Sequence, residues 1–264
     1  MSLLALYQAI EKNDWVDLPA GWLQGRTLYG GLAAAMLMHK ARSTIQDEQQ
    51  KLLSCSVTFV GPIEQAQVKL TAEVLRKGRS VTSVEVRLWQ NDAVQTIMLA
   101  SFGAMRESSL MVDQEKSAPE LTPINDLKVY PLHPLAPECM KQMQLVWAEG
   151  APPCTASTEP DFAGWMRFHP EMHDNRDMTL TDLMIAFDMW PPGVLPMLKQ
   201  IAPASSLTWQ LTYLNPLQNK IHDWMKYKVF TDSAKDGYST EYAHLWDANN
   251  RLIAIARQTV TVFA

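Results

Sequence analysis

The sequence is poor in the residues that mark several common protein classes. Its three cysteines are odd in number and far apart, and none belongs to a C-x-x-C motif. Neither a disulfide framework nor a zinc site is therefore indicated. No apolar run reaches the roughly 18 residues that a membrane-spanning helix requires. The first fifteen residues predict a short amphipathic helix, whose acidic residues come too early for a secretory signal. We expect a cytoplasmic protein that does not enter the membrane.

Positive charge and familiar catalytic motifs are also scarce. Lysine and arginine number 23 against 28 aspartates and glutamates, and they form no basic patch that would bind nucleic acid. The chain lacks the G-x-S-x-G, H-E-x-x-H, P-loop and G-x-G-x-x-G motifs, which disfavours serine hydrolases, zincins and nucleotide-binding proteins. His169 and His173 have the spacing of a metal-binding pair on a helix, but Pro170 argues against a helix and no third ligand is near. We expect no metal site.

The most informative feature is an internal repeat. CSVTFVGPI from Cys55 resembles WQLTYLNPL from Trp209, and Thr58 matches Thr212 at an offset of 154 residues. Chance similarity between strand-forming segments is the alternative explanation, because apolar alternation followed by proline is common. The same order of elements in both halves favours a true repeat.

Each half predicts one helix followed by four strands. The first helix is predicted over residues 30–46 and the second over residues 179–190. The predicted strands cover residues 51–60, 66–76, 80–90 and 93–103 in the first half, and residues 205–214, 223–232, 239–247 and 251–262 in the second half. Both halves place a Leu-Trp pair before a hairpin loop rich in Asn and Asp, which tolerate positive φ.

The two repeats predict two domains joined by a linker. We expect an N-terminal unit over residues 1–110, a proline-rich linker over residues 111–160 with a short helix near residues 138–146, and a C-terminal unit over residues 161–264. The first helix is apolar nearly all round, so a curved antiparallel sheet must wrap it. Two such α+β units would join their sheets edge to edge into one continuous sheet, which protects the inner edge strands.

Several segments resemble the acyl-CoA thioesterase II family, the double-hotdog thioesterases. They are YGGLAAAMLMHKA, VTFVGPI and EVLRKGRSVTSVEVRLWQND in the first half, and IAFDMWPPGVL, SSLTWQLTYLNP and LIAIARQTV in the second half. The likeness covers nearly the whole chain apart from the linker. It implies a double hotdog fold and hydrolysis of acyl-CoA, and the fold is better supported than the activity.

The resemblance also implies three catalytic residues. In that family an Asp, a Ser or Thr and a Gln hold the hydrolytic water, and these fall on Asp188, Ser206 and Gln258. A shift of two residues would replace Ser206 by Thr208, which we expect on the same face of its strand. The choice between the two hydroxyls stays open.

Gln258 is conspicuous without any family. It is the only polar side chain on one face of LIAIARQTVTV, and an unpaired buried amide costs about 1 to 3 kcal/mol. The repeat places Ala100 at the corresponding position of the first half. A core glutamine bonded to backbone is the alternative to a catalytic one.

Asp188 interrupts an apolar helix near its end, where the first half has Leu37. The helix dipole and burial should both raise the pKa of this carboxyl group, which suits a general base. The alternative is an exposed helix end. Asp182, six residues earlier, is more typical of a helix start.

Tyr29, Gly30 and Gly31 open the first helix and are candidate substrate-binding residues. Free amides at a helix start can stabilise an oxyanion, and glycines let a ligand approach the backbone. Tight packing of helix on sheet is the alternative role of the glycines. Apolar residues between helix and sheet, including Met36 and Met38, would line an acyl tunnel.

The sequence thus predicts an acyl-CoA thioesterase of lipid metabolism that needs no cofactor and releases a free acid and CoA. The first alternative is a non-catalytic acyl-CoA or fatty-acyl binding protein of the same fold, and the second is a structural dimerisation module. The resemblance further implies a homo-oligomer, with neither nucleic acid nor membrane as a partner.

Overall fold

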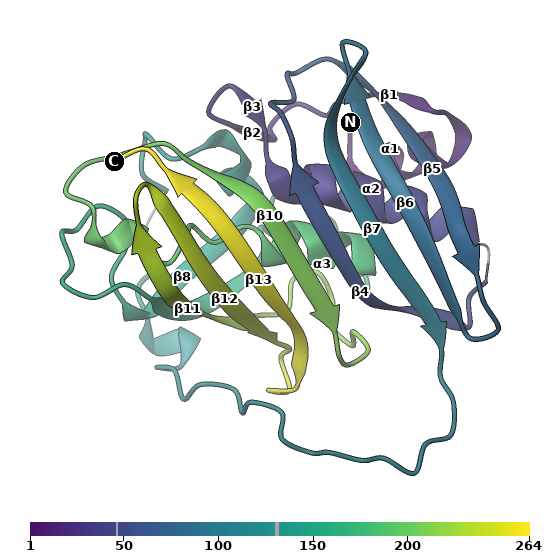
Figure 1. Cartoon of the computed structure of the whole chain (residues 1–264). Coiled ribbons are helices and arrows are strands. Elements are labelled where there is room, and N and C mark those ends of the chain that lie inside the picture. Colours follow the sequence, from purple (N-terminus) through teal and green to yellow (C-terminus); the bar gives the residue numbers. More distant parts are fainter. Residues whose placement is uncertain (46, 130–131) are drawn as a thin grey trace.

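The computed structural model describes residues 1–45, 47–129 and 132–264, and its main feature is a single large antiparallel sheet (Figure 1). The first half contains α1 (Leu3–Lys12), β1 (Trp15–Asp17), β2 (Leu23–Gln24), β3 (Thr27–Leu28), α2 (Gly30–Ile45), β4 (Gln50–Phe59), β5 (Gln67–Lys77), β6 (Val81–Gln90) and β7 (Ala93–Ala104). The remainder contains the short 3-10 helices η1 (Ile124–Asp126), η2 (Glu138–Gln142) and η3 (Leu195–Met197), the helix α3 (Leu180–Phe187), and β8 (Met143–Gly150), β9 (Phe162–Phe168), β10 (Ala204–Tyr213), β11 (Met225–Lys235), β12 (Tyr238–Trp246) and β13 (Leu252–Val262).

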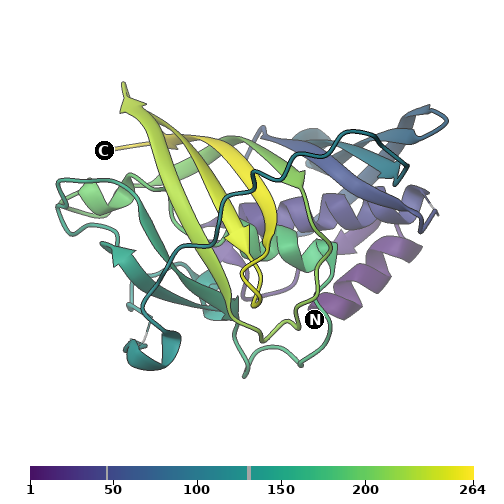
Figure 2. The same cartoon turned by 90° about the horizontal axis from the view of Figure 1, so that it is seen from below.

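The sheet has 11 strands among the described residues, in the order β1-β5-β6-β7-β4-β10-β13-β12-β11-β9-β8. The two halves meet where β4 pairs with β10, with Val57 opposite Trp209. The helices α2 and α3 lie together on one side of the sheet (Figures 1 and 2). This α+β arrangement confirms the predicted double hotdog fold, with two helix-wrapped units joined into one continuous sheet.

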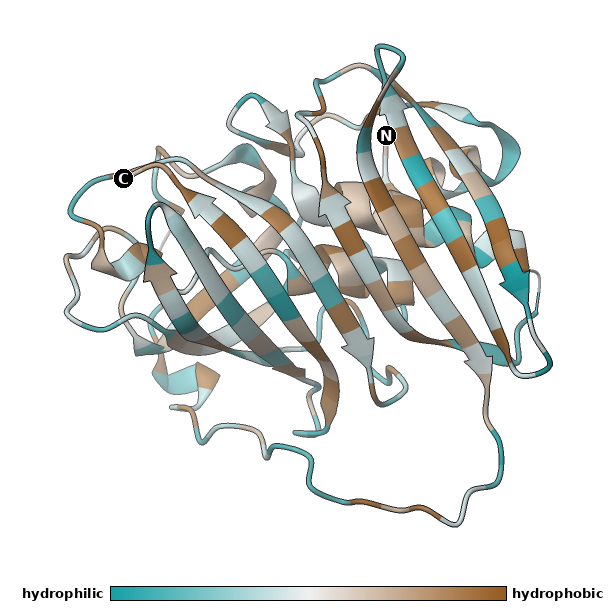
Figure 3. Cartoon of the chain, viewed as in Figure 1, coloured by the Kyte–Doolittle hydropathy of each residue, from teal (hydrophilic) through white to brown (hydrophobic). Residues whose placement is uncertain are grey.

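Both predicted core helices and all eight predicted strands are present, with ends that differ by up to three residues. Gln46, the last residue of the first predicted helix, lies outside the described residues. Apolar and polar residues alternate along the strands, as Figure 3 shows for β5 and β6. Alternation with period two therefore located the strands correctly.

The prediction for the middle of the chain was wrong in part. Where we expected a short helix over residues 138–146, a 3-10 helix ends at Gln142 and strand β8 follows. This strand and β9 extend one edge of the sheet, and β1 extends the other. Their apolar alternation is weak or short, so pairing with a neighbour, which sequence does not reveal, decides their conformation. The domain boundaries at residues 110 and 160 stay a prediction.

The helix α2 is enclosed as its composition requires. Every residue from Gly31 to Met38 is buried, and so is Ala41. The helix α3 is shorter and begins with a capping box, in which Thr179 and Asp182 exchange hydrogen bonds. The expectation that Asp182 favours the helix start is confirmed. Within the described residues, no helix has the length and apolar character that crossing a membrane would demand.

Strand registers support the internal repeat. Cys55 on β4 pairs with Ala100 on β7, and Trp209 on β10 pairs with Gln258 on β13. Since β4 corresponds to β10, Ala100 is the counterpart of Gln258, as the alignment of the halves predicted. The Asn- and Asp-rich hairpin loops also behave as predicted, because Asn91, Asp92 and Asn250 have positive φ.

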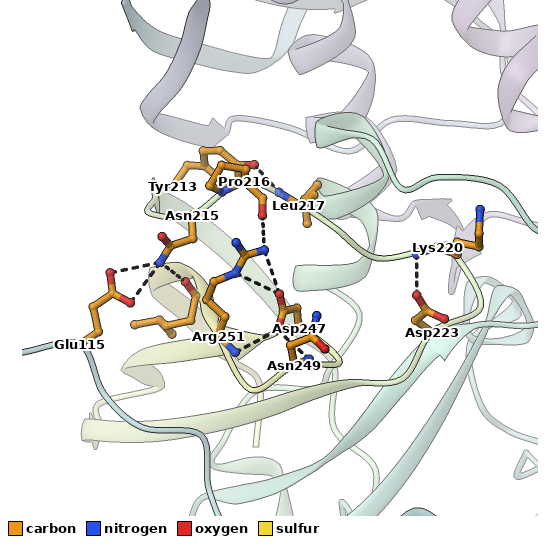
Figure 4. A network of polar contacts seen from close by, with 11 residues as sticks. Glu115, Tyr213, Asn215, Pro216, Leu217, Lys220, Asp223, Asp247, Asn249 and Arg251 are labelled. Atoms are coloured by element: carbon orange, nitrogen blue, oxygen red, sulfur yellow. Dashed lines mark hydrogen bonds and ion pairs between the residues drawn. The ribbon is translucent and has the colours of Figure 1, made fainter. Parts of the chain in front are cut away.

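The second copy of the repeated stretch ends in a polar anchor (Figure 4). Arg251 pairs with the buried Asp247 and also donates to the carbonyl oxygen of Pro216 at 2.6 Å. Asn215 donates to the carbonyl oxygen of Leu252 at 2.8 Å. These contacts tie the turn after β10 to the hairpin between β12 and β13.

The segment after β7 runs across to the C-terminal half and is held along its path (Figure 1). The indole of Trp246 donates to the carbonyl oxygen of Lys116 at 2.8 Å, and Lys226 donates to that of Pro119 at 3.0 Å. Strand side chains therefore fix part of the predicted linker against the outer face of the sheet.

Candidate active site

Asp188 stands at the end of α3 and is partly buried. It is the C-cap residue, with φ −92° and ψ 0°, directly before the segment that holds Pro191 and Pro192. Burial raises the pKa of its carboxyl group to about 7, although hydrogen bonds from Gln258 and from the backbone of Gly31 lower it. A carboxyl group with this pKa is half ionised near neutral pH and can accept a proton from water.

The carboxyl group of Asp188 also lies at the start of α2. The backbone of Gly31 bonds to it, and a methyl group added at Gly30 would come within 3.1 Å of its Oδ2 atom. The sequence placed Asp188 only at the unfavourable C-terminal end of its own helix. The structure adds the N-terminal end of the other helix, whose amides favour negative charge. The absence of a side chain at Gly30 lets the carboxylate come close.

Tyr29 connects the two helices. Its buried phenol donates a hydrogen bond to the carbonyl oxygen of Ile185 in α3 at 2.7 Å. A side chain at Gly31 would collide with the Tyr29 ring, so this glycine permits the contact. All three predicted substrate-binding residues thus have visible structural roles, and contact with substrate stays a prediction for each of them.

Gln258 on β13 contacts both other predicted catalytic residues, Asp188 and Ser206. Its amide nitrogen Nε2 lies 3.5 Å from Oδ1 of Asp188 and makes a short hydrogen bond to the hydroxyl group of Ser206. The three side chains come from α3, β10 and β13, and the fold brings them together. The carboxyl group and the carboxamide therefore face each other, close enough to bind one water molecule.

Ser206 and Thr208 do not share a face of β10, contrary to our expectation. Ser206 pairs with Val260, while Thr208 pairs with Thr259, and the register shifts at Leu207. This β-bulge adds one residue and reverses the alternation of side chains. Ser206 is partly buried beside Gln258, whereas Thr208 is exposed. The geometry favours Ser206 as the hydroxyl of the site.

Strand β12 contributes a buried carboxylate that sequence reasoning missed. Glu241 lies opposite Gln258 in the pairing of β12 with β13 and is only 3% exposed. A signal existed, because Ser239, Glu241, Ala243 and Leu245 alternate along one face that is otherwise small or apolar. Glu241 on β12, like Gln258 on β13, is thus a large polar residue on a strand face that is otherwise small or apolar.

Neither a metal-binding cluster nor an acyl tunnel is visible among the described residues. Among the described residues, no group of three or more His, Cys, Asp and Glu side chains is placed to hold a metal ion. His169 uses its Nδ1 to accept a hydrogen bond from the backbone of Glu171. A cavity of about 310 Å³ near the N-terminus is lined by residues that include Trp22 and Arg176, and it does not reach Asp188. The acyl tunnel stays a prediction.

Comparison with known proteins identifies the family. Residues 18–103 match the sequence model of the acyl-CoA thioesterase N-terminal domain, and residues 114–262 match that of the C-terminal domain. No similar sequence was found among curated proteins.

Several solved structures have the same fold. A conserved protein of unknown function with a hot dog fold from Alicyclobacillus acidocaldarius is 20% identical, with a TM-score of 0.81 over 95% of this chain and 92% of that one. The tesB protein of Mycobacterium avium subsp. paratuberculosis is 14% identical, with a TM-score of 0.76 over 100% of both chains. Acyl-CoA thioesterase II TesB2 of Mycobacterium marinum is 15% identical, with a TM-score of 0.71 over 97% of both chains. At these identities the structures show the fold, and the family follows from the two domain matches, which together span most of the sequence. The chain therefore belongs to the acyl-CoA thioesterase family and is a thioester hydrolase.

Proposed function

We propose that the chain hydrolyses acyl-CoA thioesters by direct attack of a water molecule that Asp188, Ser206 and Gln258 hold. The observation that carries this proposal is the position of the Gln258 amide between the Asp188 carboxylate and the Ser206 hydroxyl. An amide donor beside a carboxylate with a pKa of about 7 suits the binding and deprotonation of water.

In this mechanism the water oxygen accepts a hydrogen bond from Gln258 and donates one to Asp188. Asp188 takes the proton while the oxygen attacks the thioester carbonyl carbon. The carbonyl oxygen becomes negative, and the backbone amide of Gly30 at the start of α2 stabilises it, since the backbone amide of Gly31 bonds to Asp188. The carbon–sulfur bond then breaks, and the CoA sulfur receives the proton from Asp188, which leaves the free acid.

The comparison with the first half supports a functional role. At the positions of Asp188 and Gln258 the first half has Leu37 and Ala100, and both are fully or almost fully buried. Apolar residues would serve the core of the second half equally well, because buried polar groups cost stability unless they are paired. Retention of an acid and an amide in one half is consistent with a single hydrolytic site.

The experiment is a thiol-release assay on the purified chain with a panel of CoA esters from acetyl to palmitoyl, together with aromatic esters. We expect release of CoA, and a loss of a hundredfold or more in kcat for Asp188→Asn, as removal of a general base implies. Near-normal turnover by a folded Asp188→Asn protein would refute the mechanism. Tight binding of acyl-CoA without thiol release would instead indicate an acyl-binding protein.

Two expectations from the resemblance accompany the proposal. We propose a homo-oligomer, which sedimentation analysis of the purified chain would test, and a location in the cytoplasm, which cell fractionation would test.

A further inference from the structure

Glu241 is a buried carboxylate that the proposed mechanism does not use. It lies directly opposite Gln258 across β12 and β13, so the two side chains share the inner face of the sheet. Side chains opposite each other on antiparallel strands have Cβ atoms about 5 Å apart. Glu241 is therefore a neighbour of the proposed site on the strand next to β13.

The carboxylate of Glu241 also holds the turn that follows Asp188. Its Oε2 atom accepts a buried hydrogen bond of 2.7 Å from the backbone amide of Gly193. Pro191 and Pro192 have no N–H group, so Gly193 provides the first backbone donor after the two prolines. The bond fixes the end of a segment that begins at the proposed general base.

The same turn is fixed at two further points. The carbonyl oxygen of Gly193 accepts a hydrogen bond of 2.9 Å from the backbone amide of Asp161. A methyl group added at Gly193 would come within 2.7 Å of the hydroxyl oxygen of Thr231 on β11. Gly193 thus packs tightly on the sheet, and only its N–H depends on a charged side chain.

The first half has apolar residues at the positions that correspond to Glu241 and Gln258. The pair Glu241 and Gln258 corresponds to Val84 and Ala100, which lie opposite each other on β6 and β7. Burial raises the pKa of Glu241 to about 7; the Gly193 amide lowers it, and the nearby charges of Asp161 and Asp188 raise it. A carboxylate in this position costs stability that a valine would not. The second half therefore replaces two neighbouring apolar residues, and only one of them belongs to the proposed water site.

We infer that Glu241 is a positioning residue of the hydrolytic site, which holds the turn through the amide of Gly193 and thereby keeps the carboxylate of Asp188 directed at Gln258. This inference rests on the proposed function. Glu241 touches neither the water nor the substrate in this role. Its contribution is the fixed path of the chain from Asp188 to Gly193.

The test compares Glu241→Gln with Glu241→Val. Glutamine keeps an oxygen that can accept the hydrogen bond from Gly193, so we expect kcat within about threefold of the original. Valine, the residue of the first half, removes the acceptor. We expect kcat to fall about tenfold or more while KM changes less than about threefold, because the defect lies in the orientation of the general base.

The pH dependence provides a readout that simple loss of stability would not change. If the turn shifts, Asp188 loses the hydrogen bonds from Gly31 and Gln258 that lower its pKa. Both variants lack the charge of Glu241, so the comparison between them isolates the turn: the acidic limb of the kcat profile should lie at higher pH in Glu241→Val than in Glu241→Gln. The other acidic and phenolic groups around Glu241 are the same in both variants. They are Asp161, Asp188 and Tyr227.

Val84→Ala is the matched control. It opens a cavity at the corresponding position of the first half, so it should lower the melting temperature and leave kcat and its pH profile unchanged. If Glu241→Val does not fold, Glu241→Met, which keeps the length of the side chain, repeats the test.

The inference is overturned if folded Glu241→Val retains the original kcat and pH profile, or if Glu241→Gln is as impaired as Glu241→Val. Asp188→Asn in the same assay separates this failure from that of the proposed function. If Asp188→Asn is active, the proposed function itself is refuted. If Asp188→Asn is inactive and Glu241→Val is fully active, only the inferred role of Glu241 is refuted.

Discussion

The amide nitrogen of Gln258 lies 3.5 Å from the carboxylate oxygen Oδ1 of Asp188, although the two residues are 70 positions apart in the sequence. One belongs to the last strand of the chain and the other to the end of α3. Their meeting follows from the packing of α3 on the inner face of the sheet. The expected consequences of this contact can be measured.

The first prediction concerns the pH dependence of turnover. A general base must be ionised, and burial raises the pKa of Asp188 to about 7. We expect kcat to rise with pH through an apparent pKa near that value and to fall by about tenfold per unit well below it. Measurement of kcat between about pH 5 and about 9 with a saturating acyl-CoA checks this. A flat profile down to about pH 5, where an ordinary Asp is still ionised, would contradict a raised pKa.

The second prediction concerns the stability of Asp188→Asn. The pKa of Asp188 is higher in the folded chain than in the unfolded one, so the folded state binds its proton more tightly. The contribution of this carboxyl group to the free energy of unfolding is fully present below about pH 4. It is lost as pH rises toward about 7. At about pH 8 we expect Asp188→Asn to unfold at a higher denaturant concentration than the original protein. The expected gain in the free energy of unfolding is on the order of 1 to 4 kcal/mol.

The advantage of Asp188→Asn should shrink toward about pH 4, where the original carboxyl group is already neutral in the folded state. Urea unfolding at both pH values gives the comparison. A variant that is less stable than the original at the higher pH would show that the carboxylate is well solvated or well paired, against its raised pKa.

The third prediction distinguishes the two candidate hydroxyls. Ser206 bonds to Gln258, whereas Thr208 is exposed on the opposite face of β10 beyond the bulge. We expect Ser206→Ala to lower kcat by about tenfold to a hundredfold and Thr208→Ala to leave it unchanged within about twofold. Steady-state kinetics of the two variants provide a matched test. The reverse result would assign the role to Thr208.

The fourth prediction concerns the start of α2. A methyl group at Gly30 would come within 3.1 Å of Oδ2 of Asp188 and within 3.2 Å of the ring of Phe59. We expect Gly30→Ala to displace the carboxylate and lower kcat by about tenfold, with little loss of stability because alanine favours a helix. Kinetics and thermal unfolding of this variant are the measurements. Unchanged kcat would mean that the carboxylate tolerates a shift.

The strands and core helices were predictable from local pattern. Alternation along β6 and the apolar run from Gly31 to Met38 each demand one kind of burial, whatever the rest of the chain does. Strand β8 was not predictable in this way, since its burial is irregular and pairing with β9 stabilises it. Edge strands depend on a partner that no local pattern announces.

The candidate site was only partly predictable. A lone amide on an apolar face indicated Gln258, and an acid within an apolar helix indicated Asp188, because each residue breaks a local pattern of polarity. The bulge at Leu207 was not predictable, because one extra residue changes the face of every residue beyond it without changing composition. Glu241 was present in the same kind of pattern as Gln258 and was overlooked.

By itself the sequence determined the two repeated units, the residues that each must bury and the polar groups that only the second unit accepts. These follow from period and polarity, which act within a few neighbouring residues. The tertiary structure alone decided that Asp188 faces the start of α2, that Ser206 rather than Thr208 meets Gln258, and that Glu241 holds Gly193. Those contacts join segments far apart in the chain. They come within hydrogen-bonding distance only when the helices pack on a sheet whose strands pair in a fixed register.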